Sequence, residues 1–188
     1  MPDSGRTPRR ASRPRLLVLA GLPGTGKSTL ARALAESLDA VWLRVDTIEA
    51  ALVEAGVPRS FETGLAAYVV VRDLAREHLD LRHDVVIDAV NGVEPARRMW
   101  RELAAECGAR ESVIEVVCSD REAHRRRVES RPAPTPPLPP PTWDEVVQRE
   151  YEPWGEPTLV VDGLASPDDN LVAIRRYLRG ARAGPTPR

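Results

Sequence analysis

The segment GLPGTGKST, residues 21–29, constrains this chain more than any other stretch of its sequence. It has the spacing of glycine, four residues, glycine, lysine and serine or threonine that forms a phosphate-binding loop. The apolar run RLLVLA, residues 15–20, precedes it and suits a fully buried parallel strand. After it, Leu30, Leu34 and Leu38 recur every four residues, as on one face of a helix. The order of strand, glycine-rich loop and helix therefore predicts a loop that holds phosphates with its backbone N–H groups.

The individual residues of this loop have separate predicted roles. Its glycines lack a Cβ atom, so successive N–H groups can point at one anion beside the positive end of the helix. Lys27 is expected to reach the β- and γ-phosphates of a nucleotide and Ser28 to bind a magnesium ion, neither of which a plain glycine turn needs. The predicted nucleotide-binding residues are Gly21, Leu22, Pro23, Gly24, Thr25, Gly26, Lys27, Ser28 and Thr29.

Length and composition indicate one globular domain. The 188 residues suffice for one core, and the 42% of hydrophobic and 29% of charged residues are ordinary for a globular protein. A net charge of -1 argues against a surface devoted to nucleic acid, and no apolar run reaches the length of a membrane span. Cys107 and Cys118 match no common metal or redox spacing, so we expect reduced thiols and a cytoplasmic location. The four tryptophans suit either a core or an oligomer interface.

Both ends of the chain are predicted to lie outside the folded domain, which we place at residues 15–180. Residues 1–14 combine several arginines with proline, glycine and serine, and residues 181–188 are similar. Such composition is typical of a solvated, disordered tail. The alternative for residues 1–14 is an electrostatic arm that touches nucleic acid.

Four further short apolar runs are predicted strands: residues 40–46, 84–90, 112–119 and 158–163. Helical patterns separate them, so the chain predicts a parallel sheet with helices on both faces, a three-layer α/β/α fold. Helix ends are also indicated: Pro95 and Gly108 should bound one helix, Ser119 and Glu122 offer a capping box, and Ser166 suits the N-cap of the last helix.

Two carboxylates follow predicted strands, where parallel sheets present functional residues. Asp46 ends the second strand, and it could take the proton from an attacking hydroxyl. Asp88 ends the third strand and suits a magnesium site, usually through water. The two roles could be exchanged, and either residue could instead cap the following helix.

The segment that follows the fourth strand is rich in arginine and then in proline. Phosphoryl transfer spreads negative charge over the equatorial oxygens, so arginines that close over the γ-phosphate lower the barrier. Arg127 and Arg131 are four residues apart and are the predicted lid residues; a solvated basic face is the alternative. The prolines of residues 131–143 exclude a helix or a central strand there, and we place a lid at about residues 121–143. A semi-rigid polyproline connector is the alternative for residues 131–143. His124 is expected at the surface.

An acceptor site has weaker signals. Asn91, just after the predicted magnesium carboxylate, could hold an acceptor or make the turn before the next helix. Tyr68 and Arg72 lie four apart on a predicted helix and could line an acceptor pocket, or lie in the core and in solvent respectively.

With these residues in place, the chain resembles the small phosphate-loop kinases, the group that includes adenylylsulfate kinase, gluconate kinase, chloramphenicol phosphotransferase, zeta toxin and polynucleotide kinase. The likeness spans about residues 15–180 and rests on the loop, Asp46, Asp88 and the pair Arg127 and Arg131. It implies a five-stranded parallel P-loop NTPase sheet of order 2-3-1-4-5, with ATP and Mg²⁺ as cofactors. VDTIEAAL, DAVN and REYEPW look most like bacterial ATP-binding proteins of this group.

The resemblance implies an enzyme that moves the γ-phosphoryl group of ATP to a hydroxyl of a small molecule. Residues 47–49 are Thr-Ile-Glu, without the arginine that polynucleotide kinases place after the base, which argues against a nucleic-acid acceptor. No Asn-Lys-x-Asp motif for guanine is present, which favours ATP over GTP. The alternatives are a toxin-like or nucleic-acid 5′-hydroxyl kinase and a non-catalytic nucleotide-binding regulator.

Overall fold

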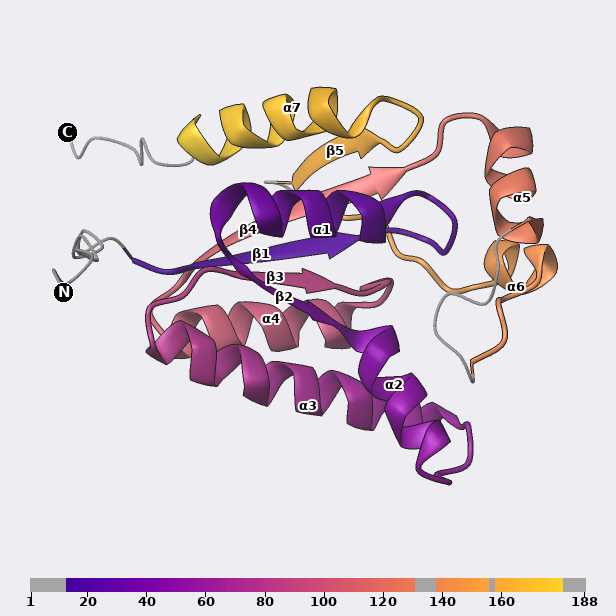
Figure 1. Ribbon diagram of the computed structural model, residues 1–188, viewed down its shortest axis with the longest axis horizontal. Helices are drawn as coiled ribbons and strands as arrows, with labels where there is room; N and C mark the ends of the chain where they lie inside the picture. The colour runs from indigo at the N-terminus through magenta and orange to yellow at the C-terminus, as the bar shows by residue number, and fades with distance from the viewer. Residues whose placement is uncertain (1–12, 131–137, 156–157, 181–188) are drawn as a thin grey trace, which may run out of the picture.

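A five-stranded parallel sheet organises the protein, whose computed structural model describes residues 13–130, 138–155 and 158–180 (Figure 1). The strand order is β2-β3-β1-β4-β5, as the resemblance implies, and every neighbouring pair is parallel. The strands are β1 (Arg15–Ala20), β2 (Val41–Arg44), β3 (Val85–Asp88), β4 (Arg110–Val117) and β5 (Thr158–Asp162).

Helices cover both faces of the sheet and its carboxyl edge. Helices α1 and α7 lie on one face, α3 and α4 on the other, and α2, α5 and α6 stand at the edge to which the strands point (Figure 1). The helices are α1 (Lys27–Leu38), α2 (Val45–Glu54), α3 (Phe61–Asp80), α4 (Glu94–Glu106), α5 (Arg121–Glu129), α6 (Trp143–Val147) and α7 (Pro167–Gly180). Among the described residues, no helix is long and apolar enough to cross a membrane.

The central strand β1 joins the two halves of the core. Leu16 and Val18 pack towards α3 and α4, whereas Leu17 and Leu19 pack towards α1 and α7. All four side chains are fully buried, because a central parallel strand is covered on both faces. This explains why residues 16–20 form a continuous apolar run rather than an alternating one.

Strand register sets the positions of the site residues. Asp88, the last residue of β3, pairs with Leu19 of β1 on one side and with Arg44 of β2 on the other. The phosphate-binding loop leaves β1 just after Leu19, so Asp88 lies between this loop and the end of β2. One edge of the sheet therefore holds the loop, Asp88 and Arg44 together.

The second strand is shorter than the sequence predicts. Residues 40–46 form a strand only over Val41–Arg44, and α2 begins at Val45. Asp46 is thus in the first turn of α2, where a carboxylate is favoured by the helix dipole, and Arg44 rather than Asp46 is the N-cap residue.

Of four predicted helix ends, three agree with the structure. Pro95 stands in the first turn of α4 and Gly108 after its end has a φ of 59°, as predicted. Ser166 Oγ accepts a hydrogen bond from the N–H of Asp169, as expected of an N-cap. The capping box of Ser119 and Glu122 is wrong: the N-cap of α5 is Asp120, because its carboxylate accepts from two backbone N–H groups, at 2.8 and 3.0 Å.

Most of the proline-rich segment, residues 131–137, lies outside the described residues. The described remainder contains Leu138, which is buried, and Thr142, which caps α6 in a capping box with Glu145. The predicted absence of helix therefore holds over residues 138–142, and α6 begins at Trp143, the last residue of the predicted segment.

Candidate functional site

The phosphate-binding loop curls between β1 and α1. Gly21, Gly24 and Gly26 all have positive φ, and Gly26 is the N-cap residue of α1. At Gly24 a side chain is excluded twice, because φ is 86° and a Cβ atom would lie 2.6 Å from a methyl carbon of Val128 in α5. The loop is therefore both a turn and a surface on which α5 packs.

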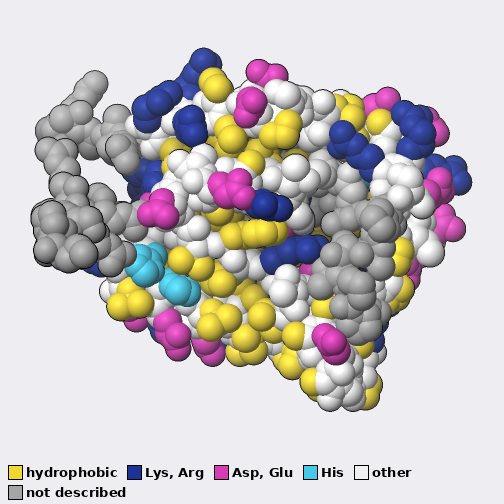
Figure 2. Space-filling model, viewed as in Figure 1, with side chains coloured by type: hydrophobic (Ala, Val, Ile, Leu, Met, Phe, Trp, Pro, Cys, Tyr) yellow, Lys and Arg dark blue, Asp and Glu magenta, His cyan; other side chains and the backbone are white. Residues whose placement is uncertain are grey.

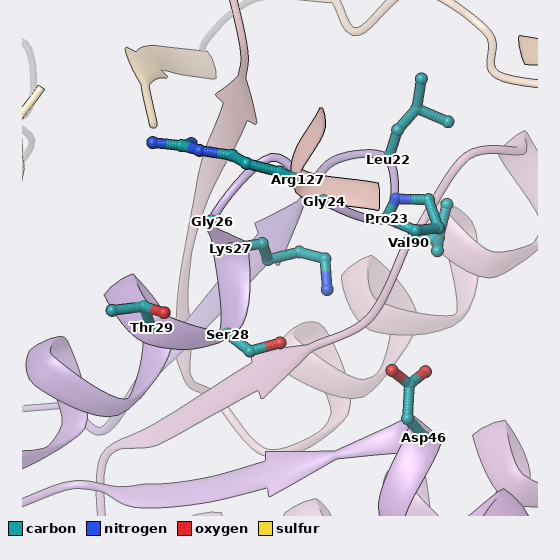
Figure 3. A pocket seen from close by; sticks show the side chains of 10 residues that line it. All are labelled: Leu22, Pro23, Gly24, Gly26, Lys27, Ser28, Thr29, Asp46, Val90 and Arg127. Atoms are coloured by element: carbon teal, nitrogen blue, oxygen red, sulfur yellow. The ribbon is translucent and has the colours of Figure 1, made fainter. Parts of the chain in front are cut away.

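A hollow of about 170 Å³ opens in front of the loop (Figure 3). It is bounded by the loop, by Asp46 of α2, by Val90 after β3 and by Arg127 of α5. The carboxylate of Asp46 points into it from the side facing Lys27 and Ser28 (Figure 3). The complete lining is Leu22, Pro23, Gly24, Gly26, Lys27, Ser28, Thr29, Asp46, Val90 and Arg127.

A second hollow of about 320 Å³ adjoins the first and shares Gly26, Thr29 and Arg127 with it. Its other lining residues come from α1, β4, the connection between β5 and α7, and the first turn of α7: Leu30, Val116, Gly163, Ala165, Pro167 and Asn170. Arg127 stands between the two hollows, and its Nη1 donates to the carbonyl oxygen of Gly163 at 3.0 Å. The second hollow was not predicted from the sequence, since no motif marks the β5–α7 connection.

Charged side chains of alternating sign run along the strand ends beside the first hollow. Lys27 Nζ donates to Asp88 Oδ1 at 2.7 Å. Arg44 Nη2 donates to Asp46 Oδ2 at 3.1 Å, and Arg44 Nε lies 3.7 Å from Asp88 Oδ2. The Asp88 side chain is fully buried, and the Arg44 side chain is 14% exposed. The structure thus places the predicted Asp46 and Asp88 on either side of Arg44, which the sequence analysis did not identify.

The two residues predicted to bind magnesium are a serine and a buried aspartate. Ser28 lines the first hollow, and the buried Asp88 Oδ2 has no hydrogen-bond partner among the described residues. No cluster of three His, Cys, Asp or Glu occurs in the described part of the chain. A hydroxyl with one carboxylate fits Mg²⁺ that takes its remaining ligands from phosphates and water.

Helix α5 is anchored directly on the phosphate-binding loop. His124 is buried, its Nε2 lies 2.7 Å from the carbonyl oxygen of Pro23, and its ring meets Trp143 edge to face. The expectation that His124 is a surface residue is therefore wrong, because it sits at the contact between helix and loop. No local pattern distinguishes a histidine that contacts a residue so far away in sequence.

The arginines of α5 divide between the site and solvent. Basic and acidic side chains mix over this helix in the space-filling view (Figure 2), and Arg125 pairs with Glu129 there. Arg127 instead lines both hollows, so for this residue the site interpretation is favoured over a solvated face. The other predicted lid arginine, Arg131, lies outside the described residues.

Asn91 supports the site from behind. It is fully buried with φ at 51°, its Nδ2 donates to the carbonyl oxygen of Leu19 at 2.9 Å, and its Oδ1 accepts from Trp100 Nε1 at 2.8 Å. Of the two roles predicted for Asn91, these contacts favour the turn.

Tyr68 and Arg72 of α3 follow the second of their two predicted alternatives, in which Tyr68 lies in the core and Arg72 near solvent. Tyr68 packs against the core, its hydroxyl accepts from the N–H of Asn91 at 3.3 Å, and burial raises its pKa to about 12. Arg72 pairs with the neighbouring Asp73 at 2.8 Å in a partly exposed position.

Charged residues from other segments lie close to Glu49 in α2. Glu49, one helical turn after Asp46, has its pKa raised by burial and then by the charge of Asp46, while Arg59 and Arg149 act in the opposite direction. Arg149 follows α6 and Arg59 precedes α3, so segments distant in sequence bring charge to one place. No sequence motif links Glu49, Arg59 and Arg149, so none of them is predicted as a site residue.

The segments DAVN and REYEPW, which support the resemblance, meet around a buried arginine. Arg97 of α4 donates to the carbonyl oxygens of Asn91 and Gly92 at 3.0 Å each and to that of Pro153 at 2.8 Å. Its guanidinium lies 4.0 Å from the ring centre of Trp154. Arg97 therefore ties the turn after β3 to the segment that follows α6.

Comparison with known proteins agrees with this geometry. A family model described as AAA domain matches residues 16–151. A protein of Mycobacterium tuberculosis, described as uncharacterized, is 34% identical in an alignment of 116 residues that covers 56% of this chain and 23% of that protein. The chain thus spans about a quarter of the length of the curated relatives it matches.

Several solved structures with the same fold are described as kinases. A proposed kinase of Chloroflexus aurantiacus superposes with a TM-score of 0.72 and 22% identity over 90% of this chain and 98% of that one. An APS kinase of Mycobacterium tuberculosis, in complex with AMPPNP and APS, gives 0.65 and 18% over 89% and 98%. At these identities the likeness establishes the fold, which is that of the phosphate-loop kinases.

Proposed function

The chain belongs to the AAA domain family, and from that premise we propose that it transfers the γ-phosphoryl group of ATP to a hydroxyl group of a small molecule. One observation carries the proposal: a carboxylate, Asp46, faces the same hollow as Lys27, Ser28 and Arg127 (Figure 3). A site that only held a nucleotide would need the loop but no carboxylate directed at the end of the phosphate chain. Phosphoryl transfer to an alcohol needs both.

The donor is proposed to lie across the two hollows. Its phosphates would occupy the smaller one against the loop N–H groups and the amino end of α1. The nucleoside would occupy the larger one, between Arg127 and the connection from β5 to α7. Because Arg127 borders both hollows, its guanidinium can reach the phosphates from the nucleoside side.

The acceptor is proposed to approach Asp46 from α2 and the segment after α6. Its hydroxyl oxygen attacks the γ-phosphorus, the bond from that phosphorus to the oxygen bridging to the β-phosphate breaks, and ADP leaves. The hydroxyl proton passes to the Asp46 carboxylate. Glu49, Arg59 and Arg149 bring charge of both signs to this side, which suits a polar acceptor.

Lys27 and Arg127 would stabilise the charge that develops on the transferred group. A magnesium ion held by Ser28 and, through water, by Asp88 would neutralise the phosphates. The protein's own contribution is then to position donor and acceptor on either side of Asp46.

The experiment is a screen of hydroxyl-bearing metabolites, first for thermal stabilisation with magnesium AMPPNP and then for acceptor-dependent ADP formation from ATP. We expect at least one compound to do both. Lys27→Ala should abolish nucleotide binding, whereas Asp46→Asn should bind nucleotide and lose turnover. Tight nucleotide binding with no transfer to any compound would instead indicate a nucleotide-dependent regulator.

A further inference from the structure

Arg44 stands at the centre of a chain of four charged side chains. Lys27, Asp88, Arg44 and Asp46 alternate in sign, and the contacts that join them measure 2.7, 3.7 and 3.1 Å in that order. The register of β2 and β3 places Arg44 directly beside Asp88. One guanidinium is therefore shared between the proposed base, Asp46, and the buried carboxylate that contacts the loop lysine.

The middle contact of this chain is incomplete. Arg44 Nε and Asp88 Oδ2 are both buried, and neither has a hydrogen-bond partner among the described residues. They lie 3.7 Å apart, just beyond hydrogen-bond distance. Buried polar atoms without partners are rare and call for an explanation. A small movement of Arg44 would therefore let its Nε donate a hydrogen bond to Asp88 Oδ2.

Binding of the donor changes the balance around Asp88. This step rests on the proposed function, in which Lys27 Nζ contacts the β- and γ-phosphates. The same ammonium now contacts Asp88 Oδ1, so the phosphates compete with Asp88 for it. A buried carboxylate that loses a charged partner is strongly destabilised unless another cation compensates. In the proposed function magnesium would reach Asp88 only through water, whereas Arg44 is a neighbouring cation already within 4 Å of Asp88 Oδ2.

We propose that Arg44 is a positioning residue that moves from Asp46 to Asp88 when the donor's phosphates engage Lys27. Closing the gap requires a shift of less than about 1 Å at Nε, which a guanidinium on a strand end can make by side-chain rotation. The Nε that would donate to Asp88 Oδ2 and the Nη2 that donates to Asp46 Oδ2 belong to one rigid planar group. A rotation that brings Nε to Asp88 therefore carries Nη2 away from Asp46.

The shift links the donor to the base. While Arg44 Nη2 donates to Asp46 Oδ2, that oxygen is occupied and less able to accept a proton from a hydroxyl. Once Arg44 turns to Asp88, Asp46 Oδ2 is free on the side of the hollow. Both carboxylate oxygens of Asp46 are therefore available to the acceptor hydroxyl once the phosphates are in place, whereas one of them is held by Arg44 before then.

The direct test follows the side-chain N–H of Arg44 by nitrogen-15 NMR during titration with magnesium AMPPNP. The Nε signal, assigned by its loss in Arg44→Lys, should shift on binding and exchange more slowly with water. It should stay in place in Asp88→Asn, and the control Arg76→Gln, which alters an exposed pair with Glu106, should behave as the wild type. An unchanged Nε signal at saturating AMPPNP would refute the relay.

A binding experiment gives an independent readout. Arg44→Gln should weaken AMPPNP binding in calorimetry about tenfold, the scale of one charge-assisted hydrogen bond. The same substitution in Asp88→Asn should have little effect, and Arg44→Lys should recover part of the loss. Equal losses in both backgrounds would mean that Arg44 only supports the fold. If AMPPNP does not bind the wild type at all, the proposed function itself is refuted.

Discussion

Gly163 allows the connection between β5 and α7 to lie against the phosphate-binding loop, and Gly163→Ala tests how closely the two are packed. A Cβ atom at this position would lie 1.7 Å from the carbonyl oxygen of Thr25, which belongs to the loop. Carbon and oxygen atoms that are not bonded do not approach below 3.0 Å, so the two backbones must separate by about 1.3 Å. Because the clash is with a backbone carbonyl oxygen, no side-chain rotation can relieve it.

The magnitude follows from overpacking. Inserting a methyl group into a packed contact typically destabilises by about 1–3 kcal/mol. For a chain of this length, 2 kcal/mol corresponds to a fall in melting temperature of about 4–8 °C. Because the displaced Thr25 backbone belongs to the phosphate-binding loop, we also expect ADP affinity to fall by about tenfold or more, since a misplaced N–H group loses a charge-assisted hydrogen bond.

The matched control is Gly64→Ala in α3. A Cβ atom there meets nothing within 4 Å, and alanine is favoured over glycine inside a helix by about 0.5–1 kcal/mol. In thermal unfolding, the melting temperature should therefore fall in Gly163→Ala and rise in Gly64→Ala. In calorimetry, ADP affinity should fall in Gly163→Ala and stay unchanged in Gly64→Ala. If Gly163→Ala has the melting temperature and the ADP affinity of the wild type, the connection between β5 and α7 does not pack closely against the phosphate-binding loop.

Three further predictions concern residues behind and beside the loop. Asn91→Ala leaves the buried Trp100 N–H without its acceptor and should lower the free energy of unfolding by about 2–3 kcal/mol in urea titrations. Burial raises the pKa of Tyr68 to about 12, so the folded state keeps this proton while the unfolded state loses it near pH 10. The free energy of unfolding should therefore fall between about pH 10 and 12. Urea titrations at stepped pH should show a smaller fall in Tyr68→Phe. His124→Ala removes the contact with Pro23 and should weaken ADP binding severalfold in calorimetry, with unchanged affinity as the contrary result.

The parts of the site that sequence predicts are those whose chemistry is encoded locally. The loop is specified by its own glycines and by Lys27, and Asp46 and Asp88 follow apolar runs whose carboxyl ends meet at one edge of a parallel sheet. Arg127 could be selected because arginines on a helix after the fourth strand can reach the same edge. Each of these inferences needs only a pattern and a rule of topology.

The residues that sequence reasoning missed depend on pairing between distant segments. Arg44 gains its role from the register that sets β2 against β3, and an arginine at the end of a short apolar run has no distinctive local signal. His124 contacts Pro23 across 101 positions of sequence, and Gly163 is required by the loop that it touches rather than by its own turn. The cap of α5 was misplaced by one residue, because Ser119 and Asp120 are both good cap residues and only the backbone geometry decides between them.

The measurement that tests the central claim most directly uses ATP with an isotope label in its γ-phosphoryl group. The protein is incubated with labelled ATP and the best acceptor from the metabolite screen, and mass spectrometry follows the label. We predict that the label appears on the acceptor in step with ADP, and that Asp46→Asn binds ATP with near wild-type affinity but transfers at least about a hundredfold more slowly, within the usual range for loss of a general base. Label found only in inorganic phosphate, or transfer unaffected by Asp46→Asn, would contradict the account.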